Sequence, residues 1–340
     1  MWHCCFGVRF ILSIDMMILC AALLGEAAIG YPDVVFRAIS HPVVWIGAGI
    51  SWLDRIGNRA TQPDWARRLC GVLAVLGLLS GTVGPIWLLQ HEILQALPFP
   101  FAILLLAVPA SSLLASRSLY FHVQAVADGL HDHGLAGGRD AVAMIVGRNP
   151  QALDEAGVVR AAIESLAENF SDGVVAPVLW CGAFGLPGIV FYKTVNTADS
   201  MIGHRTPRHA AFGWAAARLD DVINLPASRL SAVWIVLAAL AHGGDAPGGA
   251  GGAVKAVWRD AGSHRSPNAG WPEAAMAGAL GLRLAGLRIY GEAVVDDGWM
   301  GDGRAEANEA DLRRALSLYR TACAIQIVSA FLVTGLIARG

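Results

Sequence analysis

The stretch LCGVLAVLGLLSGTVGPIWLLQ, residues 69–90, carries no charged side chain and decides the class of fold. An α-helix that crosses a lipid bilayer needs about 20 mostly apolar residues. Residues 99–119 and 317–338 have a similar length and character. The composition agrees, because only 15% of the residues are charged, whereas soluble proteins carry about 25%. The sequence therefore predicts an all-α, polytopic helical membrane protein.

Three other apolar runs fit a simple spanning helix less well. Residues 10–29 hold two carboxylates, residues 174–192 are interrupted by two prolines, and residues 222–242 contain an arginine. Polar groups inside a span are costly, and they usually face protein or water rather than lipid. We therefore expect the second and third runs to be re-entrant or buried in protein, where irregular backbone is tolerated. This leaves fewer than six true spans.

The loops between the apolar runs indicate the orientation of the chain. Segments 40–68 and 117–160 are rich in arginine, whereas the link 91–98 has no lysine or arginine. By the positive-inside rule, the first two segments are cytoplasmic and the link is outside. We predict one multi-pass domain over residues 1–340 in the cell (inner) membrane, with helical loops and an active site that face the cytoplasm.

The charge and the cysteines exclude other classes of protein. A net charge of −2 offers no surface for nucleic acid. The six cysteines form no CxxC pair, and several lie in apolar runs, where a thiol behaves as a small hydrophobic group. We therefore predict neither a disulfide framework nor a cysteine metal site.

The densest polar cluster is ESLAENFSDG, residues 164–173. Its carboxylates Glu164, Glu168 and Asp172 are spaced i, i+4 and i+8, which places them on one face of a helix. Like charges at this spacing repel each other, and a soluble helix would carry them as a solvated face. Here they run directly into an apolar run, where three acids are costly unless a cation or a positive substrate compensates them. This context favours a functional role.

Two more polar clusters, KTVNTADS and RLDDVIN, follow at residues 193–200 and 218–224. Each holds an aspartate and an asparagine one helical turn apart. Carboxylates and carboxamides arranged in this way suit Mg²⁺, which takes hard oxygen ligands and often shares them with phosphate. Nearby lysine and arginine side chains could hold phosphate or carboxylate groups. The alternative is that these charges neutralise one another as buried ion pairs.

The histidines carry less information. The run His131-Asp132-His133 could bind a metal ion, but a loop turn with solvated histidines is the simpler interpretation. The pair His41-Pro42 would, on its own, only mark the entry to a helix.

Taken together, these stretches resemble the CobD/CbiB family, the adenosylcobinamide-phosphate synthases. The blocks ENFSDG, NTADSMIG and ARLDDVIN are highly specific together, whereas one alone would be weak. Tyr31 and Asn149 stand where the family commonly has aspartate, so neither is assigned a catalytic role. The matching motifs occur in one order over about residues 20–320: HPVVWIG (41–47), IVGRNP (145–150), ESLAENFSDGVVAP (164–177), YKTVNTADSMIGH (192–204), FGWAAARLDDVIN (212–224), SRL (228–230) and PNAGWPEAAMAGALGLRLAG (267–286).

The resemblance implies ATP-dependent formation of an amide. The acid would be a propionate side chain of adenosylcobyric acid, and the amine (R)-1-amino-2-propanol or its O-phosphate. A carboxylate is a poor acyl donor and must be activated, for example as an acyl phosphate, which calls for Mg²⁺ and for a base that frees the amine. The implied cofactors are Mg²⁺ and ATP. The implied partners are the corrinoid, the amine, the lipid bilayer and other cobalamin-pathway enzymes.

The three clusters and the family motifs together give a set of candidate site residues. The carboxylates that would act in catalysis are Glu164, Glu168, Asp172, Asp199, Asp220 and Asp221. The predicted metal ligands among them are Glu168, Asp172, Asp199 and Asp221. Substrate or phosphate would be bound by His41, Arg148, Asn169, Lys193, Asn196, Arg205, Arg218, Asn224, Arg229 and Asn268.

Two other classes of membrane protein would also carry acids near the bilayer. An intramembrane prenyltransferase uses Mg²⁺ as well, but it favours two NDxxD-like motifs, and the spacing of Asn196 and Asp199 relative to Asp220-Asp221 does not give them. A transporter of a corrinoid or a cation would place charges on opposed, discontinuous helices related by repeat symmetry. No internal repeat is evident in the sequence.

Overall fold

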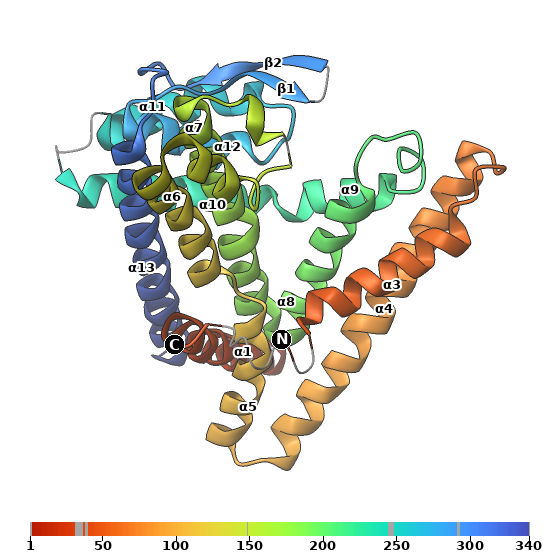
Figure 1. Ribbon diagram of the computed structural model, residues 1–340. Coiled ribbons are helices and arrows are strands. Elements are labelled where there is room, and N and C mark those ends of the chain that lie inside the picture. The colour runs from red at the N-terminus through yellow and green to blue at the C-terminus, as the bar shows by residue number, and fades with distance from the viewer. Residues whose placement is uncertain are drawn as a thin grey trace. The chain divides into compact units, whose positions relative to one another are not determined.

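The computed structural model describes residues 2–30, 37, 40–147, 149–243, 248–290 and 293–339, without the side chains of residues 2–10 and 287–297. Almost all of the described chain is helical (Figure 1), which confirms the predicted all-α class. One antiparallel hairpin, β1 (Leu284–Tyr290) with β2 (Ala293–Met300), was not predicted. The chain divides into two compact units, each made of separate stretches. The first unit is Met1–Ala115, Ala176–Asn224 and Ser329–Gly340, and the second is Ser116–Val175 and Leu225–Val328.

The first unit is organised around helix α8 (Ala176–Ile202), which packs against every other helix named here. Apolar side chains of α3, α4, α8 and α9 form a buried core, and burying each large one contributes roughly 1.5–3 kcal/mol. The core is formed by Ile46, Ile50, Val75, Ala198, Ile202, Phe212 and Ala216. The other helices are α1 (Trp2–Ala28), α3 (Pro42–Gly57), α4 (Asp64–Ala96), α5 (Phe99–Ser112) and α9 (Trp214–Ile223).

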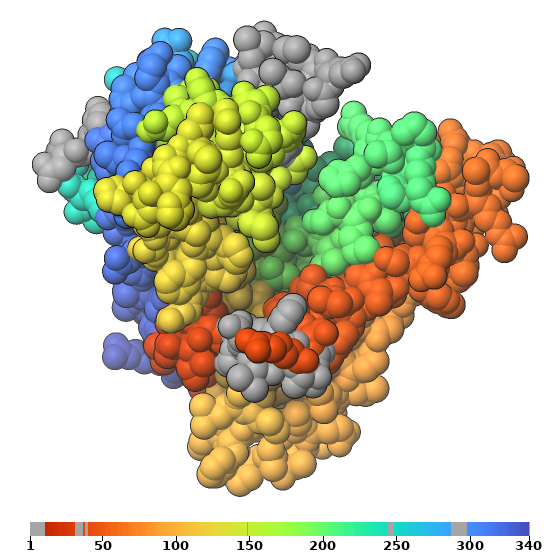
Figure 2. Space-filling model, in the orientation of Figure 1, coloured from red at the N-terminus to blue at the C-terminus, as the bar shows by residue number. Residues whose placement is uncertain are grey.

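Helices α4 and α5 turn large apolar side chains outward. Leu73, Trp87 and Phe101 are 59%, 57% and 65% exposed, and the light orange surface in Figure 2 belongs to these two helices. Such a surface is expected where helices face lipid rather than water.

Helix α8 is broken in its middle, as the proline-interrupted run in the sequence predicted. Phe184 and Gly185 leave the helical conformation, and Gly185 takes a φ of 63°. The amide of Leu186, which the break frees, donates to the side-chain oxygen of Gln90 at 2.9 Å. The amide nitrogen of Gln90 donates in turn to Asp15 at 3.2 Å. Polar side chains of α4 and α1 therefore provide the hydrogen bonds for the backbone amide freed at the break. This supports the expectation that the segment is buried in protein.

The second unit contains helices around α12 (Gly270–Leu280), whose residues are all buried except Trp271. Helix α12 is rich in alanine and glycine, so that α7, α10 and α11 can pack closely against it. The other elements are α6 (Ser116–Val142), η1 (Pro150–Ala152), α7 (Glu155–Asn169), η2 (Phe170–Val175), α10 (Leu225–Ala241), α11 (Gly249–Asp260), η4 (Ala261–Ser263) and most of α13 (Glu309–Arg339).

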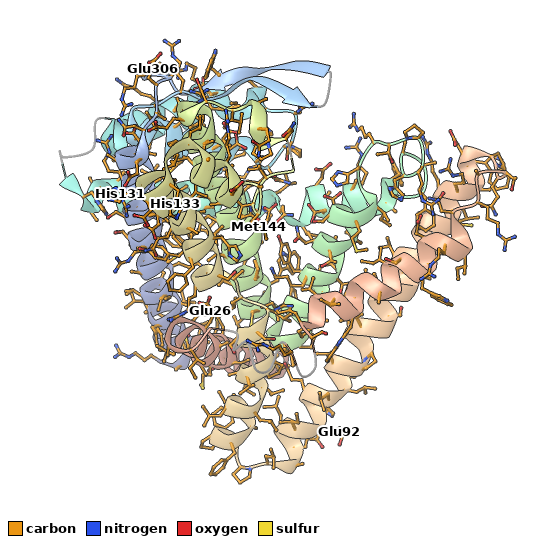
Figure 3. All side chains as sticks on the ribbon, in the orientation of Figure 1. Glu26, Glu92, His131, His133, Met144 and Glu306 are labelled. Atoms are coloured by element: carbon orange, nitrogen blue, oxygen red, sulfur yellow. The ribbon has the colours of Figure 1, made fainter. Side chains whose placement is uncertain are left out.

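The histidine pair of the sequence analysis lies in α6 rather than in a loop turn, which corrects that expectation. Both side chains are exposed (Figure 3), and the His131 ring lies 3.4 Å from Glu309. Because Gly134 follows with a φ of 61°, the helix is kinked just after His133. The described residues form no group of three His, Cys, Asp or Glu side chains that could hold a metal ion.

The spans agree with a multi-pass membrane protein. Five helical stretches are long and apolar enough to cross a bilayer, and a bent pair of helices raises the number to six. The stretches are Ile11–Ala28, Asp64–Ala96, Phe99–Val142, Glu155–Ile202 and Glu309–Arg339, and the bent pair is Trp214–Ile223 with Leu225–Ala241, at 43°. The bend in this pair follows the polar cluster at 218–224, where the sequence also indicated an irregular span.

Candidate functional site

The second and third polar clusters of the sequence meet where α8 packs against α9. The carboxylate of Asp220 accepts hydrogen bonds from the amide of Asn224 at 2.9 Å and from that of Asn196 at 3.4 Å. The carbonyl oxygen of Asn224 accepts from the hydroxyl of Tyr192 at 2.9 Å. Asp220, Asn224 and Tyr192 are buried, so these bonds hold the Asp220 carboxylate in one orientation.

Two more carboxylates complete what we call the α8–α9 cluster, formed by Tyr192, Asn196, Asp199, Asp220, Asp221 and Asn224. Asp199, Asp220 and Asp221 lie close enough to repel one another. Asp221 pairs with Arg218 at 3.3 Å, and both side chains are partly exposed. Asp199 accepts no hydrogen bond from the described residues. The α8–α9 cluster therefore brings three acidic side chains together, and Arg218 pairs with one of them.

The Asp199 carboxylate lies at the end of α8, directly against Gly203. A Cβ atom at position 203 would collide with this carboxylate, so only glycine leaves it in place. The backbone amide of Gly203 donates to the carbonyl oxygen of Asp199 at 2.7 Å, which closes the last helical turn. His204 follows and lies near enough to Asp199 to interact with its charge. The motif NTADSMIGH thus places the Asp199 carboxylate in the last turn of α8.

The donors of the α8–α9 cluster fit a magnesium ion that shares its ligands with phosphate. Its free oxygens come from carboxylates and carboxamides, the hard ligands that Mg²⁺ prefers, and Mg²⁺ is usually bound by one or two carboxylates plus substrate phosphates. Asp199 and Asp221 would hold the ion, while Asp220 is already occupied by two amides. The other predicted metal ligands, Glu168 and Asp172, belong to the second unit, so the set of four stays a prediction.

The loop after α8 is held by what we call the Asp54 clamp, formed by Asp54, Asn58, Arg67 and Arg208. The Asp54 carboxylate accepts two hydrogen bonds from Arg208, at 3.1 and 2.5 Å, and one from Asn58 at 2.7 Å. Asn58 also binds the carbonyl oxygen of Arg208 and accepts from Arg67. Arg205 lies in the same loop, is exposed, and forms no ion pair with the described residues.

The Asp54 clamp was not predicted from the sequence. Burial alone would raise the pKa of Asp54, but the hydrogen bonds from Arg208 and Asn58 outweigh burial, so the pKa lies below its ordinary value. Asp54 is therefore charged, and both of its carboxylate oxygens accept hydrogen bonds from other residues of the chain. The only local signal was an acid four residues before an asparagine near the end of a predicted apolar helix.

In the second unit, Glu164 and Glu168 lie in α7, and the chain continues from Phe170 as a π-helix that contains Asp172. The shared face of these three carboxylates stays a prediction. Glu164 is buried, and its carboxylate accepts from the backbone amide of Ala285 at 2.9 Å. A short π-helix often marks a functional segment, because its wider turn changes which side chains lie together.

Asn169 connects two of the sequence motifs. Its amide donates to the carbonyl oxygen and the hydroxyl of Ser165, at 2.9 and 3.2 Å. The hydroxyl of Ser165 donates to the carbonyl oxygen of Ile145 at 2.8 Å. The start of IVGRNP is thereby fixed against α7. Arg148 of that motif and Tyr31 lie outside the described residues.

Arg229 and Asn268 come together at the start of α10. One terminal nitrogen of Arg229 donates to Asn268 at 3.2 Å and to Ser228 at 3.0 Å, and the guanidinium lies 4.4 Å from the centre of the Trp271 ring. The other nitrogens of this guanidinium donate to no described residue, so they can bind a ligand oxygen.

His41 acts as the predicted helix entry. Its Nδ1 accepts from the amide of Val43 at 3.2 Å, so its Nε2–H donates to the carbonyl oxygen of Ser112 at 2.7 Å. Burial lowers its pKa, the bond to Ser112 opposes this, and nearby Lys193 lowers it further. A neutral ring with both nitrogens in use is better suited to capping a helix than to binding phosphate. Its predicted role in substrate binding stays untested.

Comparison with known proteins identifies the family. The family model described as CobD/Cbib protein matches residues 19–319. The chain belongs to the CobD/CbiB family. It is 50% identical to the cobalamin biosynthesis protein CobD of Sinorhizobium sp, over 91% of this chain and 95% of that protein. It is 49% identical to the protein of the same name from Rhizobium meliloti (strain 1021), over 91% and 94%.

A third CobD/CbiB relative, cobalamin biosynthesis protein CobD of Rhodobacter capsulatus, is 46% identical over 92% of this chain and 94% of its own length. No solved structure matches the chain. The matched range agrees with the predicted one, about residues 20–320, and it contains every predicted site residue from His41 to Asn268. Membership of the CobD/CbiB family places the chain in cobalamin biosynthesis.

Two residues of this CobD/CbiB chain belong to the candidate site without having been predicted. Tyr192 was quoted as the first residue of a motif, but its bond to Asn224 could not be seen from spacing, because the partners are far apart in sequence. Gly203 was hidden in the same motif. A glycine four residues after an aspartate, at the end of a motif on a helix, was the available signal for a close contact.

Proposed function

We propose that the chain is an adenosylcobinamide-phosphate synthase, an acid–amine ligase of the membrane. It would join a propionate of adenosylcobyric acid to (R)-1-amino-2-propanol or its O-phosphate, using ATP and Mg²⁺. The observation that carries this proposal is the α8–α9 cluster, in which three carboxylates lie close enough to repel one another. Such a cluster is stabilised by a bound cation.

The carboxylates of the α8–α9 cluster then have two tasks. Asp199 and Asp221 would hold Mg²⁺, which would supply positive charge to the phosphoryl group that activates the propionate. Asp220 is oriented by Asn196 and Asn224, and it is placed to accept a proton from the attacking ammonium. The amine then attacks the activated acyl carbon, phosphate leaves, and the amide forms.

The basic groups of this chain would bind the anionic parts of the substrates. Arg205 is exposed in the loop that follows Asp199, and Arg229 has nitrogens that no described residue uses. We propose that the loop and the α8–α9 cluster face the cytoplasm of the inner membrane, because the loop is basic and because ATP is found there. Cysteine-accessibility labelling at position 205 tests this orientation.

The test of the proposed function is a ligation assay with the purified full chain in detergent. We expect ATP, cobyric acid and aminopropanol or its phosphate to give the amide product, detected by mass spectrometry. The double variant Asp199→Asn/Asp220→Asn should lose the product. Glu92→Gln, an exposed acid at the far end of α4, serves as the matched control and should keep it. Product from the double variant at the wild-type rate would refute the assignment.

A transporter is the second candidate, because one observation favours it. Transporters often bind their cargo at discontinuous helices, and α8 is broken at Phe184 and Gly185. The same protein in liposomes distinguishes the two functions. Movement of corrinoid across the membrane without ATP-dependent product would indicate a transporter.

A further inference from the structure

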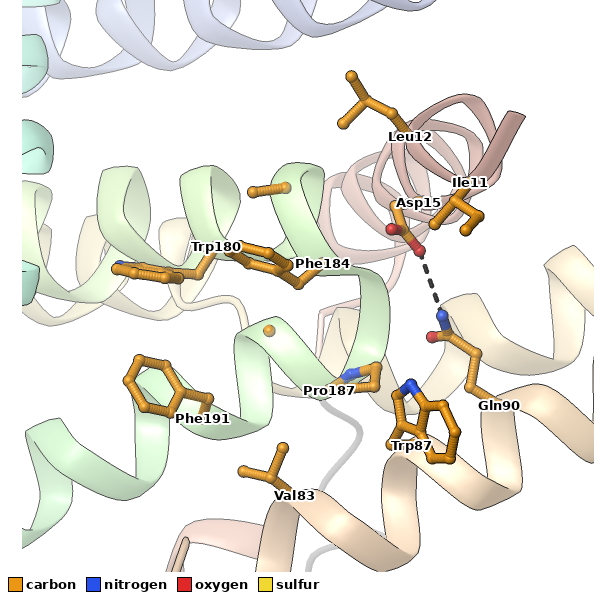
Figure 4. Close-up of a pocket in the computed structure, with 12 residues that line it drawn as sticks. Ile11, Leu12, Asp15, Val83, Trp87, Gln90, Trp180, Phe184, Pro187 and Phe191 are labelled. Atoms are coloured by element: carbon orange, nitrogen blue, oxygen red, sulfur yellow. Dashed lines mark hydrogen bonds between the residues drawn. The ribbon is translucent and has the colours of Figure 1, made fainter. Parts of the chain in front are cut away.

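The first unit contains a cavity of about 590 Å³ that the proposed ligation does not use. It lies among α1, α4 and α8, beside the break in α8 (Figure 4). Its volume is in the range of sites for small organic ligands. Most of its wall is apolar, and Asp15 is the one ionisable side chain among the residues that line it.

Asp15 is only 2% exposed and lies inside the apolar stretch Ile11–Ala28. A carboxylate in a span is costly and normally pairs with a cation. Among the side chains that the structure describes, none with a positive charge pairs with Asp15, and its hydrogen bond comes from the neutral amide of Gln90. An ionised Asp15 would therefore be stabilised by a positive partner, and none of the described side chains supplies one.

Aromatic rings line the cavity beside this carboxylate. The Trp180 ring lies 5.8 Å from that of Phe184 and 5.2 Å from that of Phe191, measured between centres. The indole N–H of Trp180 donates to the carbonyl oxygen of Ile223 at 3.3 Å, which fixes the ring. Aromatic faces attract organic cations, most strongly where water is excluded.

The rim of the cavity indicates where a ligand enters. Ile11, Trp87 and Phe184 line it and are 59%, 57% and 58% exposed. These side chains are apolar, and a tryptophan near the end of a span is typical of the membrane interface. A ligand that enters here therefore has an apolar body and comes from the bilayer or its surface.

We propose that this cavity binds an organic ammonium ion carried on an aliphatic body, with Asp15 as its counter-ion. The aliphatic body would fill the apolar wall, because a free amine of a few heavy atoms leaves most of the volume empty. An aminolipid of the bilayer has this chemistry, whereas the small amine substrate of the proposed reaction lacks the aliphatic body. The binding does not depend on the ligase activity.

The aminolipid is tested by native mass spectrometry of the full chain in detergent, with phosphatidylethanolamine and phosphatidylglycerol as probes. We expect wild type to bind phosphatidylethanolamine about tenfold more tightly than phosphatidylglycerol, since a charged hydrogen bond supplies a factor of this size. Asp15→Asn should remove this preference. Ala183→Phe, which fills the cavity and leaves Asp15 in place, should weaken binding of the aminolipid. Glu26→Gln, a buried acid of the same helix away from the cavity, is the matched control and should behave as wild type.

The soluble amine is tested by calorimetric titration of 1-amino-2-propanol. We expect no binding that depends on Asp15, because this amine has no aliphatic body; tight binding that disappears in Asp15→Asn would show a site for a small ammonium ion and would overturn the proposal. Equal binding of the two lipids by wild type would overturn it as well. If Asp15→Asn does not fold, Ala183→Phe decides alone, and its unchanged binding of phosphatidylethanolamine would also overturn the proposal. None of these measurements needs ATP or a corrinoid, so failure of the proposed ligation remains a separate result.

Discussion

Asp54 in α3 and Asp199 at the end of α8 both lie beside the loop of residues 203–213. They differ in the groups that contact their carboxylates. Asp54 receives hydrogen bonds from Arg208 and Asn58, and His209 lies 3.5 Å away. Asp199 meets no such donor among the described residues and is instead repelled by Asp220 and Asp221.

This difference separates a carboxylate that holds the protein together from one that we propose for ligand binding. When hydrogen-bond donors of the chain surround a buried acid, its carboxylate oxygens are already bonded within the folded protein and stabilise the fold. An acid held near other acids destabilises the fold until a cation arrives, and such arrangements are typical of functional sites. The sequence alone does not distinguish the two, because both are single aspartates near apolar helices.

The largest effect is expected at Asp199. Asp199→Asn should lower the rate of ligation by about 100-fold or more, as loss of a charged group in a catalytic site does. Its thermal stability should stay the same or rise, because no hydrogen bond is lost and a repulsion is removed. A ligation assay and a thermal melt of the same preparation measure both. A large loss of stability would place Asp199 beside Asp54 as a structural acid.

Asp54→Asn should show the reverse. Removing this charge leaves Arg208 without its partner, and we expect a loss of about 2 kcal/mol in the free energy of unfolding, less than for a fully buried pair because Arg208 is 55% exposed. Chemical denaturation in detergent measures the change. The residual activity should follow the folded fraction, and an activity loss in fully folded protein would instead give Asp54 a direct role in the site.

The same carboxylate predicts a dependence of stability on pH. The pKa of Asp54 is lowered on folding, so its contribution is complete above its unfolded value of 3.8 and is lost as the pH falls through the folded value. Thermal melts below pH 4 should therefore show a smaller gap between wild type and Asp54→Asn than melts at pH 7. A gap that stays constant over this range would contradict the ion pair.

Tyr192→Phe is expected to have a smaller effect. It removes the hydroxyl that donates to Asn224 and should cost about 1 kcal/mol of stability, with a several-fold loss of ligation rate because Asp220 is less well oriented. A denaturation curve and the ligation assay report the two changes. An unchanged rate would show that the orientation of Asp220 does not limit the reaction.

The smallest effect on stability is expected at Arg218. Its pair with Asp221 is partly exposed, and such pairs contribute about 0–1 kcal/mol. Arg218→Gln should therefore melt within a few degrees of wild type, while the α8–α9 cluster becomes more negative and binds Mg²⁺ more tightly. Calorimetric titration with Mg²⁺ tests this, and weaker binding would mean that Arg218 belongs to the binding site.

Much of this protein could be predicted from the amino-acid sequence. Length and apolarity of a helix are local properties, so the runs at 69–90, 99–119 and 317–338 all lie in helical stretches that are long and apolar enough to span a bilayer. Motifs are also local, and their order indicated the family that the comparisons confirm over residues 19–319. The polar clusters at 193–200 and 218–224 were found because unpaired polar residues are costly beside lipid.

Only the tertiary structure decided what each polar residue meets. Asp15 meets Gln90 across 75 positions of sequence, and Asp54 meets Arg208 across 154. The periodicity of a sequence does not predict such contacts. They depend on how the helices pack against one another, whereas periodicity reflects only which residues form a helix. The π-helix after Asn169 and the hairpin that receives Glu164 were missed for the same reason. Sequence thus determined the membrane helices and the family, and packing decided which acids are structural and which are left for a ligand.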